Sequence, residues 1–312
     1  MLRLGNMPNV KLNSQSSSGL RSDCAANVMR LSLDKALAVG NQLEVEAING
    51  TKHILLTPSM AAQCGYSMES DPWGNTRIYT SLMGCFVDNK NDATFNVDLR
   101  LQMYGENPSD VVSYDVSQTC SYTRWASREI LCDRNYMGVE PVAMVLQEAE
   151  QAGNAAKTTS SRLVMRSPYN TAETYSEDVA GVPMEVFRVS AYYMAPQGLN
   201  VVNLAAACPK GGVLFTEDMI SWHVPRRVTP LLDGRITVSE MHMGINGQRL
   251  DRSQMAARGY TLSTTDFHIV VEIPVGSPDG YYKVGEISRL EMQESLVYLH
   301  VLLKYHELLQ SR

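Results

Sequence analysis

The chain has 312 residues, of which 44% are hydrophobic and 19% are charged, and its formal net charge is −6. This composition is typical of two or three small globular domains and excludes a disordered chain. The mild negative charge argues against a nucleic-acid partner, and no apolar run is long enough to predict membrane insertion by this chain.

Residues 1–23 are polar and serine-rich, and they lack the apolar core of a signal peptide. We expect them to form a disordered lead-in. The cysteines discussed below favour an oxidising compartment, so we also expect that a signal sequence belongs to the native protein and is missing from this one.

Short β-type segments dominate residues 24–131. In TFNVDLRLQM (94–103) the apolar and polar residues alternate, which predicts a half-buried antiparallel strand. Turn residues such as Asn49-Gly50 separate the segments, and this spacing favours a small all-β sandwich. The other expected strands cover residues 28–33, 42–48, 53–56, 76–87 and 111–120.

Parts of this first region recur later in the chain. CAANVMRL (24–31) and CDRNYMGV (132–139) both fit Cys-x-x-Asn-x-Met-x-aliphatic. A second match joins two other places: Ile-Asn-Gly at 48–50 is followed by MAAQCGY (60–66), and Ile-Asn-Gly at 245–247 is followed by MAARGY (255–260). The matches predict tandem repeats at 24–131, 132–208 and 209–306, with a tail at 307–312. In such an array, function lies in surfaces and assembly more than in one catalytic pocket.

The second and third repeats differ from the first. The late half of the second resembles that of the first, but residues 141–161 hold helix formers and a polar stretch, so we expect this repeat to be incomplete by about one strand pair. The third repeat has expected strands at 212–215, 221–224, 234–245 and 267–276. Residues after 286 fit either a helical stripe or an alternating strand over 297–305, and the repeat pattern favours the strand.

The six cysteines contain no CxxC pair, and no histidine lies at ligand spacing from any of them, so a zinc site is disfavoured. Their wide spacing suits disulfides in an oxidising compartment, with fifteen pairings formally open. The third repeat lacks the equivalent of Cys64 without losing its pattern, which is typical of a disulfide cysteine. The cysteines are Cys24, Cys64, Cys85, Cys120, Cys132 and Cys208.

Other chemistry is sparse. Asn49-Gly50-Thr51 is the only glycosylation sequon, although Asn-Gly is also a plain hairpin turn. The six histidines follow no pattern, and no catalytic, metal or cofactor motif occurs, so we expect no catalytic residues, no metal and no cofactor. Trp73, Trp125 and Trp222 are expected to pack in cores, with a junction between modules as the alternative for Trp125.

Four segments, DCAANVMRLSL, AAQCGYS, GCFVDN and TCSYTRWASREILCDRNYM, resemble the ZP-N modules of the zona pellucida (egg-coat) glycoproteins, and INGQRLDRSQMAARGYTL and FHIVVEIPVGSPDGYYK look like further repeats. The resemblance implies tandem immunoglobulin-like β-sandwiches. It also implies the pairs Cys24–Cys120, Cys64–Cys85 and Cys132–Cys208, and a third repeat that relies on its hydrophobic core.

As for function, the resemblance implies a structural component of the extracellular egg coat that contributes to coat assembly and to sperm–egg recognition. Its partners would be other zona pellucida glycoproteins and sperm surface proteins. Two family features, the ZP-C half and the signal peptide, are not found in this sequence. The alternatives are a secreted or receptor-ectodomain binding module that joins no filament, and a β-sandwich hydrolase.

Overall fold

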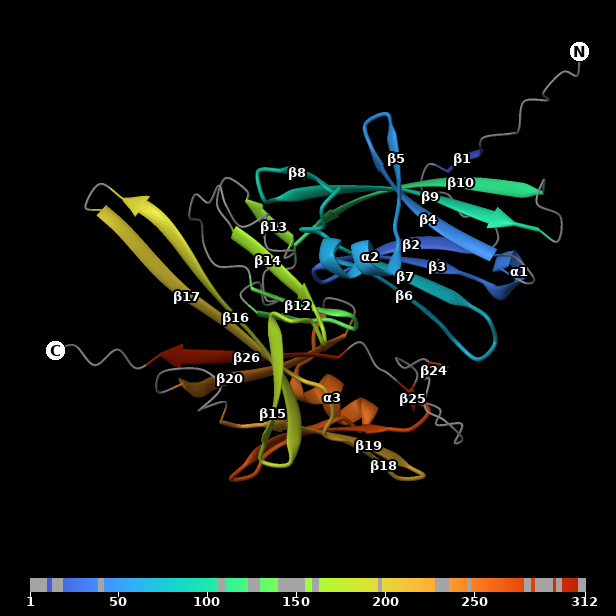
Figure 1. The fold of residues 1–312 in the computed structure, drawn as a ribbon. Helices are drawn as coiled ribbons and strands as arrows, with labels where there is room; N and C mark the ends of the chain where they lie inside the picture. Colours follow the sequence, from blue (N-terminus) through green and yellow to red (C-terminus); the bar gives the residue numbers. More distant parts are fainter. Residues whose placement is uncertain are drawn as a thin grey trace, which may run out of the picture. The chain divides into compact units, whose positions relative to one another are not determined.

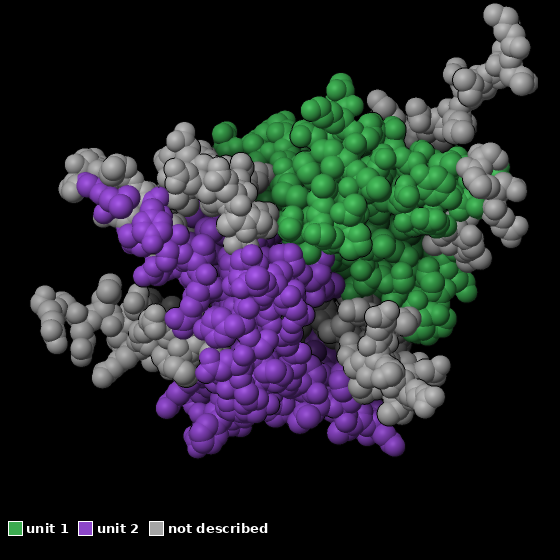
Figure 2. Space-filling view, viewed as in Figure 1, with its two compact units in different colours: residues 1–122 green, residues 123–312 purple. Residues whose placement is uncertain are grey.

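The computed structural model describes residues 10–12, 19–38, 42–105, 110–122, 130–139, 155–158, 163–195, 198–227, 236–245, 248–277, 282–283, 294–295 and 299–307. The chain forms two compact units, residues 1–122 and residues 123–312 (Figure 2). Strands dominate both units, so the chain is all-β with short helices (Figure 1).

The first unit is a sandwich of two sheets. One sheet has the order β2-β3-β7-β6, and the other has the order β1-β10-β9-β4-β5 with β8 also paired to β9. All pairs are antiparallel except β1 with β10. The strands are β1 (Val10–Leu12), β2 (Leu20–Ala25), β3 (Val28–Leu33), β4 (Gln42–Asn49), β5 (Lys52–Leu55), β6 (Tyr66–Ser70), β7 (Thr76–Ser81), β8 (Asp88–Lys90), β9 (Thr94–Tyr104) and β10 (Val111–Ser121).

The core of the first unit lies between its sheets. Along β9 every second residue is buried, as the alternation predicts, and Phe95 and Leu99 are fully enclosed. Met29 and Leu31 of β3 are buried in the facing sheet. Burying each such side chain contributes roughly 1.5–3 kcal/mol, which is the main force holding the sheets together.

Two short helices follow the Ile-Asn-Gly hairpins, at α2 (Pro58–Cys64) and α3 (Arg252–Arg258); α1 (Lys35–Ala38) is a single turn. Thr57 caps α2 through a hydrogen bond that its Oγ1 accepts from Met60 N, and Gly65 ends the helix with φ 82°. Asp251 caps α3 in the same way, and Gly259 ends it. The sequence match between MAAQCGY and MAARGY therefore reflects a short helix that occurs in both places and ends at a glycine.

The second unit contains the second and third repeats. In the second repeat the sheets have the orders β11-β12-β14-β13 and β15-β16-β17. The first of these has the same strand order as β2-β3-β7-β6, and β16 and β17 correspond to β9 and β10. The strands are β11 (Ile130–Cys132), β12 (Tyr136–Val139), β13 (Ala155–Thr158), β14 (Leu163–Pro168), β15 (Thr174–Val179), β16 (Val182–Ala195) and β17 (Gly198–Pro209).

The third repeat has sheets with the orders β18-β19-β23-β22 and β21-β20-β26, and β24 pairs with β25. Its core is built around Met243, Ile245, Tyr260, Val271 and Ile273, with Trp222 packed against it. The tail forms a strand at β26, as the alternating pattern predicts. The strands are β18 (Val213–Phe215), β19 (Met219–Pro225), β20 (Ile236–Ile245), β21 (Gln248–Arg249), β22 (Thr261–Thr264), β23 (His268–Pro274), β24 (Tyr282–Lys283), β25 (Glu294–Ser295) and β26 (Leu299–Glu307).

Three expectations need correction. The lead-in 1–23 is not wholly disordered, because residues 10–12 pair with β10 and β2 begins at Leu20. β11 begins at Ile130 and pairs with β12, so the second repeat starts before Cys132. Residues 155–158 of the segment 141–161, which we expected to be irregular, form β13 and pair with β14; 141–154 and 159–161 lie outside the described residues.

Candidate functional site

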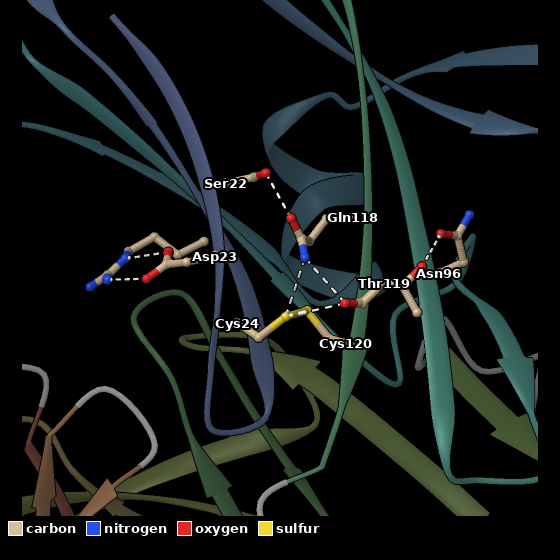
Figure 3. The surroundings of a disulfide bond; sticks show 8 residues. Ser22, Asp23, Cys24, Asn96, Gln118, Thr119 and Cys120 are labelled. Atoms are coloured by element: carbon tan, nitrogen blue, oxygen red, sulfur yellow. Dashed lines mark hydrogen bonds and ion pairs between the residues drawn. A yellow bond between two sulfur atoms is a disulfide. The ribbon is translucent and has the colours of Figure 1, made fainter. Parts of the chain in front are cut away.

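A disulfide between Cys24 and Cys120 joins the two sheets of the first unit, because Cys24 lies on β2 and Cys120 on β10, with Cα atoms 5.7 Å apart (Figure 3). Gln118 lies beside it. Its Nε2 donates to Thr119 O at 3.1 Å, and its Oε1 accepts a hydrogen bond from Ser22 Oγ at 2.8 Å. The Ser22–Gln118 bond spans β2 and β10, so a polar contact adjoins the covalent link.

The Cys64–Cys85 disulfide fastens the end of α2 to the turn after β7. Cys85 N donates to Cys64 O at 3.2 Å, so the backbones meet as well. A β-carbon at Gly84 would lie 2.9 Å from Ser81 O and 3.1 Å from Cys64 O. Glycine is needed here because a side chain would push the turn away from the helix.

The Cys132–Cys208 disulfide repeats the first arrangement, since Cys132 ends β11 and Cys208 lies on β17, with Cα atoms 5.5 Å apart. The structure therefore has the three pairs that the sequence resemblance implies, and none of its cysteines is free. The chain has no cysteine after Cys208, so the third repeat has no such link. Each link stabilises by roughly 2–5 kcal/mol through the loop that it closes.

A buried carboxylate lies next to the second of these sheet-joining disulfides. Glu185 of β16, opposite Cys208 in the register, is 1% exposed. Its carboxylate accepts hydrogen bonds from Thr174 Oγ1, Asn170 N (2.8 Å) and Ser176 Oγ (2.8 Å), and Lys210 Nζ lies 3.0 Å away. Burial alone raises the pKa of Glu185, but the hydrogen bonds outweigh burial and lower it from 4.5 to about 2. The ionised side chain ties β15 and β16 to the segment that leaves β17.

The second and third repeats meet just beyond Lys210. Gly212 has φ +81°, and a β-carbon there would overlap the carbonyl oxygen of His223 and contact Val182. His268 of β23 has Nε2 2.8 Å from Ala180 O in the β15–β16 turn. The contact of Gly212 with Val182 and the contact of the His268 ring with Ala180 O thus join these repeats within the second unit.

The remaining candidate residues lie apart. Asn49 is exposed at the turn between β4 and β5, where an oligosaccharide would have room. Trp73 is 52% exposed, which contradicts the expected core position. The reason is local: Asp71 accepts hydrogen bonds from Trp73 N and Asn75 N, and the resulting turn holds the indole outward. Trp125 lies outside the described residues.

The histidines of the described strands are dispersed, except that the rings of His223 and His268 lie 5.5 Å apart. Within the described part of the chain, no group of three or more His, Cys, Asp or Glu residues is placed to hold a metal ion. The same part contains no helix long and apolar enough to cross a membrane.

Two solved structures of the partially deglycosylated ZP1 ZP-N1 domain homodimer, which concern egg coat filament cross-linking, are similar to part of this chain. Each is 16% identical and has a TM-score of 0.29, and the match covers 33% of this chain and 96% or 90% of the solved chain. No protein-family model and no curated protein matches the sequence. The sandwich assignment therefore rests on the strand orders and disulfides described above.

Proposed function

We propose that this chain is a structural and interaction component of an extracellular egg coat, built from ZP-N-type repeats and lacking catalytic residues. Among the egg-coat proteins, the residues quoted above are similar to the multi-repeat type of fish and amphibians called zona pellucida protein AX. Its partners would be other zona pellucida glycoproteins, and sperm surface proteins would contact its exposed repeats. Asn49 would carry an oligosaccharide.

The observation that carries this proposal is the repeated disulfide between the first strand of one sheet and the last strand of the other. Cys24–Cys120 and Cys132–Cys208 occupy the same strand positions in consecutive repeats. A chain with six paired cysteines and no free thiol suits an oxidising, extracellular compartment. The sandwiches otherwise present surfaces to solvent, which fits a role in contact rather than in turnover.

Mass spectrometry of isolated egg coats, digested without reduction, tests the proposal. We expect peptides that contain Cys132 and Cys208 to be recovered as one linked species from the coat pellet after washing with high salt. Recovery of the chain only from the wash would favour the alternative, a secreted or receptor-ectodomain binding module that joins no filament. Recovery only from the cell lysate with free thiols would refute both.

A further inference from the structure

Two positions that pair aromatic rings in the first repeat hold an amine and a carboxylate in the second. Glu185 takes the place of Phe95, because each lies opposite the sheet-joining cysteine of its closing strand. Two residues after that cysteine, the second repeat has Lys210 where the first has Tyr122. The rings of Phe95 and Tyr122 pack edge to face, with centroids 4.9 Å apart. An aromatic contact has therefore become a lysine–carboxylate contact.

The third position of this group is Asn170. The strand registers match Ser167 of β14 with Thr80 of β7, so three residues further on Asn170 takes the place of Met83. Met83 is fully buried, whereas Asn170 lies at the surface of the second repeat. The second repeat thus collects an amine, a carboxylate and a carboxamide at positions where the first repeat has apolar or aromatic side chains.

The three groups contact one another. Lys210 Nζ donates a hydrogen bond to Asn170 Oδ1, and Glu185 Oε2 lies 3.0 Å from the same Nζ. Asn170 Cγ is bonded to Oδ1, so the amide carbon lies one bond beyond the atom that Nζ already contacts. A nucleophile, an electrophilic carbon and a base are therefore held together, which is what the exchange of one amide for another requires.

Backbone contacts hold these side chains in register. Asn170 N donates to Glu185 Oε1 at 2.8 Å, and Lys210 N donates to Pro183 O at 2.8 Å. Asn170 has a φ of 58°, which is uncommon for a residue other than glycine. Hydroxyl groups of β15 hold the carboxylate as well. Well-oriented groups in one molecule react as if at an effective concentration of about 10⁵–10⁸ M, so even a poor electrophile can react here.

We propose that Lys210 Nζ attacks Asn170 Cγ and forms an intramolecular isopeptide bond, with Glu185 carrying the proton between the two nitrogens. The bond would join the turn after β14 to the segment that leaves β17, 40 positions apart in the chain. The reaction occurs once per chain and turns over no substrate. This inference goes beyond the proposed function and does not rest on the egg-coat assignment.

The reaction balances without a cofactor, an oxidant or a reductant. The lone pair of the neutral amine forms the Nζ–Cγ bond, and the carbonyl π electrons move to Oδ1. Glu185 takes a proton from Nζ. The carbonyl then re-forms, the Cγ–Nδ2 bond breaks, and Glu185 passes the proton to Nδ2, which leaves as ammonia. An amine and a primary carboxamide thus give a secondary amide and ammonia.

The charges favour these roles. Burial raises the pKa of Glu185, but its hydrogen bonds outweigh burial and lower the pKa to about 2, so the carboxylate is ionised at neutral pH and can accept a proton. The Lys210 side chain is 30% exposed, so it can lose its excess proton to water, and ammonia can leave. Lysines are mostly protonated at neutral pH, so the rate should rise about tenfold per pH unit up to about pH 9.

Mass spectrometry of the full chain, secreted through an added signal sequence, tests the proposal. Chain harvested at pH 5 and transferred to pH 9 should become lighter by one ammonia. Trypsin does not cleave after a modified lysine, so digestion followed by reduction should give peptide 167–188 joined through Lys210 to peptide 189–226. A chain that loses no ammonia on prolonged incubation at pH 9, and gives no joined peptide, would overturn the proposal.

Variants separate the bond from the fold. Lys210→Arg keeps the positive charge but not the nucleophilic amine, so it should abolish the joined peptide and still give the Cys132–Cys208 link, which reports folding of the second repeat. Lys90→Arg is the matched control, since the Lys90 side chain is 70% exposed in the first repeat, and the joined peptide should form as in the wild type. A joined peptide in the Lys210→Arg protein would refute the assignment.

The role of Glu185 has its own readout. Glu185→Gln cannot carry the proton and should slow the loss of ammonia at least about tenfold at pH 9, measured on chains that have formed the Cys132–Cys208 link. Asn170→Ala removes the electrophilic carbon and should abolish the loss completely. A rate in Glu185→Gln equal to that of the wild type, or loss of ammonia from the same peptides in Asn170→Ala, would contradict the proposed chemistry.

Discussion

Replacing Glu185 with glutamine should destabilise the second repeat in a way that depends on pH. In the folded chain the hydrogen bonds to Glu185 outweigh its burial and lower its pKa from 4.5 to about 2. Because the folded-state pKa lies below the unfolded one, the ionised carboxylate stabilises the fold above about pH 4.5. That stabilisation is lost as the pH falls toward 2.

The size of the effect follows from the shift. A difference of about 2.5 pKa units corresponds to about 3 kcal/mol at neutral pH. Wild-type protein should lose this amount from the unfolding free energy of the second repeat between about pH 6 and pH 2. The Glu185→Gln protein should lack this stabilisation already at pH 6. Its unfolding free energy should therefore fall less than that of the wild type between pH 6 and pH 2.

The assay must observe the second repeat alone, because a chain of several modules does not unfold in one two-state step. Urea titrations at each pH, followed by a brief hydrogen-exchange pulse at fixed pH and mass spectrometry of β15–β17 peptides, give that local reading. Glu177→Gln on β15 is the matched control, since Glu177 is exposed. Equal pH dependence in the wild-type and Glu185→Gln proteins would refute the reasoning.

Three further predictions concern covalent links, backbone packing and glycosylation. Non-reduced peptide mapping of secreted protein should find the pairs present in the structure, and a Cys24–Cys64 link would contradict the sandwich. Gly212→Ala should lower the unfolding free energy by about 2 kcal/mol more than Gly181→Ala, measured by the same pulse method; both glycines have positive φ, but only Gly212 has a carbonyl oxygen where the β-carbon would go. Digestion with a peptide N-glycosidase should reduce the mass of secreted protein but not of Thr51→Ala, which removes the sequon and keeps the Asn49-Gly50 turn; no change in the wild type would show Asn49 to be unmodified.

The sequence predicted strands well where one face is buried and the other solvated. The alternation at 94–103 became β9 because an 11-residue strand between core and solvent imposes a period of two. The apolar run at 76–87 was predicted to be one strand, but β7 ends at Ser81. Leu82 N and Gly84 N donate to Asn27 O and Ser81 O in a buried turn, and an apolar run cannot distinguish such a turn from a strand.

The helices carried signals that periodicity alone did not reveal. Thr57 followed by Pro58 is a helix start signal, and Gly65 is a helix stop signal. Asp251 with Gln254 is a second start signal, and Gly259 is the matching stop signal. The Glu185 network had no such local signal. Its donors come from Asn170, Thr174, Ser176 and Lys210, which only the folded strands bring together.

The placement of the disulfides has a mechanical consequence. In the first two repeats a disulfide joins β2 to β10 and β11 to β17. A stretching force on the chain is therefore transmitted through the disulfide and does not load the residues between the two cysteines. Cys24 and Cys120 are separated by 96 positions, which would otherwise extend to roughly 330 Å, whereas the linked Cα atoms span 5.7 Å. The third repeat has no cysteine, so no disulfide can carry the force past its sheets. Under tension it would lengthen while the first two repeats keep their length, so it is the extensible segment of the array.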